Sequence, residues 1–232
     1  MVEHSDLAGQ PPVAKGVQYV TLPEIPDNPT AVGLLHDLRG LKMPLPPFVI
    51  LDTETSGLPH NEWAEVVELG AVAVDVDGSI LSTFDSLVQW PPPGEVAPLG
   101  SRHAFKCNDI ELTDLRHAPT PWEAWYNFCM WSGVWPPGVT VAAYNKSFDQ
   151  RMVKKTFQHV ENFQVPWAED CLYQMARDAH PTGSKVFKLE VLCKRLGILQ
   201  DGGTQLHRAL PDALLTYQVW WVLWTLAGRP SR

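Results

Sequence analysis

The sequence predicts one mixed-sheet α/β domain, and three observations support this. Residues 48–52 (Phe-Val-Ile-Leu-Asp) form a short, continuous apolar run, which is typical of a central strand covered on both faces. Two longer strand-like runs, 66–75 and 80–90, flank Asp77-Gly78, a dipeptide that suits the positive φ angles of a hairpin turn. Helices and a further buried strand then alternate, so parallel strands should join the three meandering ones, with helices flanking the sheet.

The elements of the second half follow from helix start and stop signals. Pro121 suits a first helical position and Gly133 a helix end, while Pro211 suits the first turn of the last helix. The predicted elements are helices over about 121–131, 147–159, 170–179, 189–196 and 211–226 and a strand over 139–144.

The N-terminal region differs from the rest of the chain. Residues 1–46 contain seven prolines and show no sustained hydrophobic period. We interpret this stretch as an arm or linker, with one short helix over 30–38, and we expect the folded domain over 47–228. The arm could dock a protein partner or be a loose tail.

Composition and charge exclude several classes of protein. The 232 residues are 45% hydrophobic and 19% charged, which is an ordinary globular mixture. No apolar run reaches 18 residues, so we expect no membrane span. The N-terminus lacks the basic and apolar regions of a secretory signal, and the four cysteines form no Cys-x-x-Cys pair. The simplest expected location is therefore the reducing cytoplasm.

The net charge of −8 argues at first against a nucleic-acid protein, because such proteins usually neutralise phosphates with basic side chains. The charge is unevenly spread, however. Residues 1–100 carry 3 basic and 14 acidic side chains, whereas residues 101–232 carry 15 basic and 12 acidic ones. The second part of the chain is thus more compatible with an anionic partner.

The first candidate motif is Asp52-Thr-Glu54, at the end of the first predicted strand. Residues two apart in a strand point to the same side, so both carboxylates project together. A site that keeps two such neighbours ionised usually does so around a divalent cation. Taken alone, Asp-x-Glu more often marks two surface carboxylates.

Two further motifs precede predicted helices. Asn145 follows the second buried strand and can cap a helix that carries Asp149 in its first turn. His207 lies in the loop before the last helix, and Asp212 lies in the first turn of that helix. Four carboxylates and a single imidazole suit Mg²⁺ or Mn²⁺ rather than zinc, and two such ions ~4 Å apart fit in-line phosphoryl displacement.

Together the three motifs resemble those of the DEDDh (DnaQ-like) 3′–5′ exonucleases of the RNase H-like superfamily. The matching segments are 52–57 (Asp-Thr-Glu-Thr-Ser-Gly), 145–149 (Asn-Lys-Ser-Phe-Asp) and 207–212 (His-Arg-Ala-Leu-Pro-Asp). Their order and spacing also match, and the resemblance covers roughly residues 47–226. It implies an RNase H-like fold and an exonuclease domain over 47–228.

The resemblance also implies roles for these residues. The carboxylates matching Asp52, Glu54, Asp149 and Asp212 would hold two divalent ions, and the histidine matching His207 would take a proton from the attacking water. The products would be 5′-mononucleotides released from the 3′ end. The groups expected to contact the terminal nucleotide are the backbone of Thr55, Ser56 and Gly57, the side chain of Leu58 as an apolar surface against a base, and Asn145.

The chain departs from the family pattern at two places. Tyr144 stands where many members carry a histidine, and Asn108-Asp109-Ile110 is the best match to a frequent His-Gly-Ile. We therefore take Asn108 or His103 as substitutes for the second substrate contact.

All five catalytic identities are present, so we expect an active enzyme that acts on nucleic-acid 3′ ends, with single-stranded DNA favoured. The alternatives are an exoribonuclease that trims RNA 3′ ends, a non-catalytic protein that binds nucleic-acid ends, and a proofreading subunit docked on a polymerase. The last helix, with Trp220, Trp221 and Trp224, is apolar on more than one face, so either core packing or a homodimer interface would explain it.

Overall fold

The computed structural model describes residues 43–133, 139–161, 163–169, 172–174, 188–199 and 207–227. At its centre lies a four-stranded sheet with the order β3-β2-β1-β4. The strands are β1 (Phe48–Thr55), β2 (Val66–Val74), β3 (Ile80–Leu87) and β4 (Thr140–Ala142). β2 pairs antiparallel with both β1 and β3, whereas β4 pairs parallel with β1. This mixed sheet confirms the predicted fold class.

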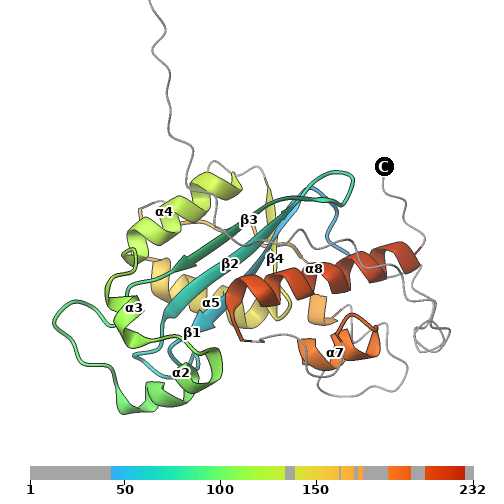
Figure 1. The fold of residues 1–232 in the computed structure, drawn as a ribbon. Coiled ribbons are helices and arrows are strands. Elements are labelled where there is room, and N and C mark those ends of the chain that lie inside the picture. The colour runs from blue at the N-terminus through green and yellow to red at the C-terminus, as the bar shows by residue number, and fades with distance from the viewer. Residues whose placement is uncertain are drawn as a thin grey trace, which may run out of the picture.

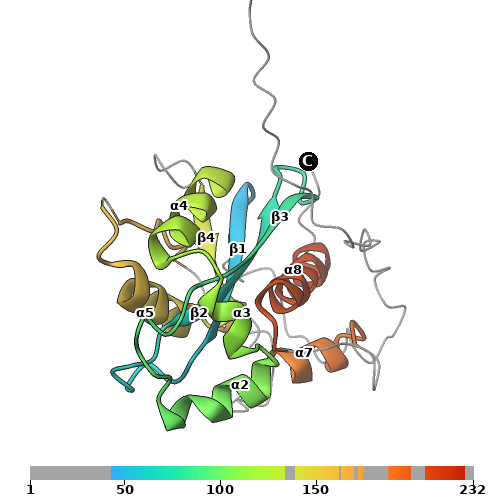
Figure 2. The same ribbon diagram turned by 60° about the vertical axis from the view of Figure 1, so that its left-hand side comes forward.

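Helices cover both faces of the sheet (Figure 1). They are α2 (Arg102–Asn108), α3 (Leu112–Arg116), α4 (Pro121–Ser132), α5 (Lys146–Phe157), α7 (Leu189–Arg195) and α8 (Ala209–Leu226). The turned view in Figure 2 shows α4 and α5 on one side of the sheet and α8 with α7 on the other, while α2 lies at the end where β1 stops.

The alternation of side chains along β1 sorts residues between these two layers. Phe48 and Ile50 pack in the core beneath α8 and α7, while Val49 and Leu51 pack in the core beneath α4 and α5. The same alternation continues to the end of the strand. It places both Asp52 and Glu54 on the α8 face of the sheet.

The tryptophans of α8 belong to the core of their own chain. Trp220 is fully buried, lies edge-on to Phe48 with ring centroids 5.0 Å apart, and donates a hydrogen bond to the Pro44 carbonyl oxygen at 3.2 Å. Trp224 is 8% exposed and stacks on Trp220. Packing within one chain therefore explains the apolar character of this helix. Met43 is also buried in this core, so the packed region includes residues just before position 47.

Several boundaries differ from the expected ones. α8 begins two residues before Pro211, because a buried carboxylate on β2 accepts a hydrogen bond from the backbone N–H of Ala209. β3 ends at Leu87 rather than at residue 90, since the Gln89 N–H turns to the carbonyl oxygen of Pro119. The helices α2 and α3 had no sequence signal.

Two expected helices fall wholly or mostly outside the described residues. The one over 30–38 lies outside the described residues, as does most of the one over 170–179. Among the described helices, none is both long and apolar enough to cross a membrane.

Candidate active site

Three of the predicted carboxylates converge at the end of β1. Asp52 and Glu54 project from the α8 face of the strand, and Asp212 comes from the first turn of α8. One oxygen from each of the three lies within 4.8 Å of the other two. Residues 160 positions apart in the sequence thus form a single acidic cluster.

Gly70 allows α8 to begin close enough to the sheet. It pairs with Asp52 across β1 and β2, and its α-carbon faces the start of α8. A β-carbon at this position would lie 2.1 Å from the carbonyl carbon of Ala209 and 2.1 Å from the backbone nitrogen of Leu210. Only a residue without a side chain permits this approach, which brings Asp212 to the two carboxylates of β1.

Burial and mutual repulsion disfavour full ionisation of the cluster and raise the pKa values of its carboxyl groups. Burial, followed by repulsion from Asp212 and Glu68, raises the pKa of Glu54 to about 8. Burial likewise raises the pKa of Asp212 to about 6. The pKa of Asp52 is raised well above its usual range by burial and then by repulsion from Asp149 and Asp212. A bound cation would relieve this repulsion.

Asp149 approaches from the other face of the sheet. It is 3% exposed, lies in the first turn of α5, and accepts a hydrogen bond from the Thr53 hydroxyl at 2.9 Å. Thr53 points to the α5 face because it lies between Asp52 and Glu54 on the strand. Burial raises the pKa of Asp149 to about 7, although the Thr53 hydrogen bond acts against this. Asp149 therefore lies beside the three-carboxylate cluster, where its negative charge repels that of Asp52.

The donor set fits a divalent cation. The Oδ1 atom of Asp212 is buried and accepts no hydrogen bond from any described residue. An unpaired carboxylate oxygen in an acidic cluster lacks the partner that a buried polar atom normally has. Carboxylate oxygens without sulfur ligands are the ligands that Mg²⁺ and Mn²⁺ prefer. Asp52, Glu54 and Asp212, with Asp149 beside them, are thus the residues that would hold metal.

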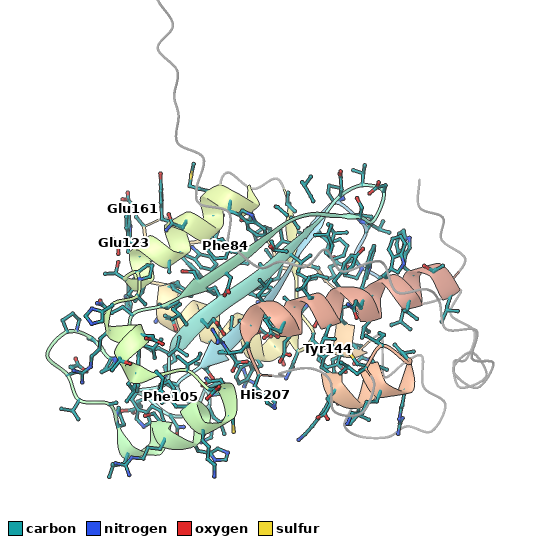
Figure 3. All side chains as sticks on the ribbon, viewed as in Figure 1. Phe84, Phe105, Glu123, Tyr144, Glu161 and His207 are labelled. Atoms are coloured by element: carbon teal, nitrogen blue, oxygen red, sulfur yellow. The ribbon has the colours of Figure 1, made fainter. Side chains whose placement is uncertain are left out.

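His207 lies at the edge of this cluster with its side chain exposed (Figure 3). Its backbone adopts a φ of 71°, and its N–H donates to Oδ2 of Asp212 at 3.3 Å. A left-handed backbone is uncommon for histidine and occurs often in functional loops. The loop therefore places the imidazole beside the carboxylates without burying it.

The turn after Glu54 divides the predicted contact residues into two groups. Ser56 is fully buried, and its hydroxyl accepts the Glu65 N–H at 2.9 Å, so its side chain holds the turn and does not face a substrate. The Thr55 hydroxyl likewise donates to the Gly57 carbonyl oxygen at 2.9 Å. Leu58, in contrast, is 55% exposed and remains available as an apolar surface.

The other residues predicted to contact the substrate, Asn108, His103 and Asn145, lie in three different environments. Asn108, the last residue of α2, is buried, and its Oδ1 accepts the Ile110 N–H at 3.3 Å. Its Nδ2 atom faces Glu54 closely enough to lower the pKa of that carboxyl, yet it has no full hydrogen-bond partner among the described residues. His103 is exposed on α2, with Nε2 3.9 Å from the Cys107 sulfur. Asn145 precedes α5 as predicted, but its side chain accepts from the Ser147 hydroxyl and caps no helical amide.

Sequence reasoning missed four residues that shape the site: Thr53, Glu68, Gly70 and Arg208. Two of them had a recognisable signal. Glu68 is the one charged residue in the otherwise apolar run 66–74, and Gly70 is a glycine inside a predicted strand, which often marks a close backbone approach. The partners of these residues lie about 140 positions away, so their roles could not be read from the strand alone.

The mixed sheet with helices on both faces is an RNase H-like fold, and the acidic cluster lies at the end of its first strand. The model of the exonuclease family (RNase_T) matches residues 49–220. The chain therefore belongs to this family, and the three motifs identify it as a DEDDh, DnaQ-like 3′–5′ exonuclease.

Curated relatives agree with this assignment. The DNA polymerase III subunit epsilon of Rickettsia prowazekii is 28% identical over 188 residues, which cover 79% of this chain and 75% of the relative. The protein of the same name from Rickettsia conorii is 29% identical over 191 residues, with the same coverage.

Solved structures support the fold. The nuclease domain of 3′hExo, a DEDDh family member bound to rAMP, aligns over 78% of this chain and 92% of its own length, with a TM-score of 0.57 and 15% identity. Escherichia coli Exonuclease I in complex with a dA16 oligonucleotide aligns over 77% of this chain and 40% of its own length, with a TM-score of 0.57 and 19% identity.

Proposed function

We propose that the protein removes 5′-mononucleotides one at a time from the 3′ end of DNA, using two divalent cations, Mg²⁺ or Mn²⁺. The observation that carries this proposal is the convergence of Asp52, Glu54 and Asp212 within 4.8 Å, beside the exposed His207. Bound cations would make water nucleophilic at neutral pH and neutralise the charge that develops on the phosphate.

The residues of the chain would divide the remaining work. His207 accepts a proton from the attacking water, since an imidazole suits proton transfer near neutral pH. The water oxygen then bonds to phosphorus, the bond from phosphorus to the 3′-oxygen breaks, and that oxygen takes up a proton. The exposed Leu58 offers an apolar surface to the terminal base. Asn108 would act from beneath the site, because its buried Nδ2 atom faces Glu54.

DNA is favoured over RNA by the comparisons. The curated relatives are named as subunits of a DNA polymerase, and Exonuclease I was solved with a deoxyadenosine oligonucleotide. The 3′hExo structure contains rAMP instead, so trimming of RNA 3′ ends is the second candidate. The chemistry at the phosphate would be the same in both cases.

The test uses 5′-labelled single- and double-stranded DNA and RNA, incubated with Mg²⁺ or Mn²⁺. We expect a ladder of products shortened stepwise from the 3′ end, fastest on single-stranded DNA, and abolished by EDTA or by Asp212→Ala. Glu95→Ala serves as the control, because Glu95 is exposed and distant in sequence from all three motifs. A ladder from RNA alone would favour the exoribonuclease. Binding without cleavage of any substrate would instead indicate a protein that binds nucleic-acid ends.

A further inference from the structure

A fifth carboxylate, Glu68, lies next to the acidic cluster on the neighbouring strand β2. Glu68 is 1% exposed, lies on β2 directly opposite Glu54, and belongs to the α8 face of the sheet. Both of its oxygens accept hydrogen bonds from the Arg208 guanidinium, with Nε 2.9 Å from Oε1 and 3.1 Å from Oε2, and Nη2 also donates to Oε1. Oε2 further accepts the backbone N–H of Ala209 at 2.9 Å.

These contacts tie the start of α8 to the middle of the sheet. Ala209 is the first residue of the helix, and the residue before it, Arg208, provides no side-chain cap. Glu68 therefore takes the place of a capping side chain, from a different strand. A buried carboxylate is tolerated when it is fully paired, and the guanidinium suits it because it is always charged and offers several N–H donors in one plane.

His207 directly precedes the anchored residue. Its φ of 71° lies in the left-handed region, where a residue with a side chain pays about 1–2 kcal/mol, so surrounding contacts must hold it there. Its side chain is exposed, which leaves little packing to fix the imidazole. Among the described residues, two restraints act on this backbone: the N–H bond of His207 to Asp212 and the anchored Arg208 that follows it.

We propose that Glu68 and Arg208 act as a positioning pair. They hold the backbone of His207 in its left-handed conformation and so keep the imidazole beside the acidic cluster. This inference rests on the proposed exonuclease activity. Neither residue touches the substrate. Arg208 acts through its neighbour, and Glu68 acts through Arg208 and the first amide of α8.

The pair predicts a specific kinetic pattern. Replacing Arg208 by methionine removes the guanidinium and keeps a long side chain, so His207 becomes free to leave the site. We expect kcat on single-stranded DNA to fall about 100-fold, the loss expected for a displacement of about 1 Å, while KM stays within threefold. Arg208→Lys keeps one charged donor and should recover part of the loss. Arg116→Met, at an exposed arginine on α3, is the matched control and should leave kcat unchanged.

A double variant separates positioning from general stabilisation. If Arg208 acts through His207, then Arg208→Met should lower kcat by less than threefold in a His207→Ala background. A multiplicative loss in the double variant would overturn the inference. So would wild-type kcat in Arg208→Met, accompanied only by a lower melting temperature. If the wild-type enzyme cleaves none of the DNA or RNA substrates, the proposed exonuclease function fails, whatever the state of the pair.

A second measurement does not depend on activity. In the metal-free protein, hydrogen exchange followed by NMR reports the backbone N–H of Ala209, which bonds to Glu68, and that of Asp212, which bonds to the Arg208 carbonyl oxygen. We expect Arg208→Met to speed exchange at both amides at least tenfold, with exchange in β1 unchanged. Unchanged protection at both amides would contradict the proposed anchor.

Discussion

The substitution Gly70→Ala tests how tightly the site depends on the distance between α8 and the sheet. The added β-carbon would lie 2.1 Å from two backbone atoms of α8, whereas ordinary contact begins at 3.4 Å. The start of the helix must therefore retreat by about 1.3 Å, because the atoms in the way belong to backbone and cannot rotate aside. Asp212 moves with the helix and leaves the 4.8 Å cluster with Asp52 and Glu54. A misplacement of about 1 Å costs on the order of 100-fold in rate, or about 2.7 kcal/mol of activation free energy.

The assay is the initial rate of shortening of 5′-labelled single-stranded DNA at saturating Mg²⁺, with thermal unfolding of the same samples. We expect Gly70→Ala to lose about 100-fold in kcat and about 1–3 kcal/mol in stability from overpacking. Gly94→Ala is the control, because its φ of 86° brings backbone strain while no atom lies within 4 Å of the added carbon. Activity of Gly70→Ala within threefold of wild type, in a folded protein, would refute the reasoning.

Three further predictions concern the same site. Thr53→Val removes a hydrogen bond that lowers the pKa of Asp149, so the half-saturating Mn²⁺ concentration at pH 7 should rise about tenfold; an unchanged value would show that the bond is unimportant for metal binding. The pKa values of about 8 for Glu54 and about 7 for Asp149 lie above those of an unfolded chain, so the folded protein binds more protons between about pH 4 and pH 8. The melting temperature in EDTA should therefore fall by about 5 °C or more as the pH rises through this window. Added Mg²⁺ should raise the melting temperature more at pH 8 than at pH 6. A melting temperature that rises with pH in EDTA would contradict the raised pKa values. Gly57→Ala places a methyl group 2.7 Å from the Trp63 ring, so the turn that carries Leu58 must move, and KM for oligonucleotides should rise about tenfold with a smaller change in kcat. An equal KM would exclude a role for this turn in substrate binding.

The parts of the fold with strong local patterns were predictable. The apolar run 48–52, the hairpin around Asp77-Gly78 and the helices expected over 121–131, 147–159, 189–196 and 211–226 all appear in the structure, with ends shifted by at most three residues. α2 was missed because its 7 residues lack the repeated apolar spacing that predicted the equally short α7, and α3 because its 5 residues are too few to show a helical period. The position of α2 matters for the site, because its last residue, Asn108, reaches Glu54.

Within the site, sequence spacing predicted which carboxylates belong together but not how each one faces the others. Asp52 and Glu54 share a face because strand geometry has a period of two, which is a local rule. Asp149 lies across the sheet and bonds to Thr53, an arrangement that depends on how α5 packs. The buried Ser56 side chain holds the turn by accepting the Glu65 N–H, a packing role that the motif spacing alone does not show.

The sequence by itself determined the family of this protein: the four motif carboxylates, the motif histidine and their order along the chain were enough to identify it. Tertiary structure decided the geometry that makes the chemistry feasible. The approach of α8 over Gly70 and the anchoring of Arg208 by Glu68 join segments about 140 residues apart. Such contacts arise only when the sheet and helix pack together, because side-chain and backbone volumes, rather than local propensities, set the distance between layers.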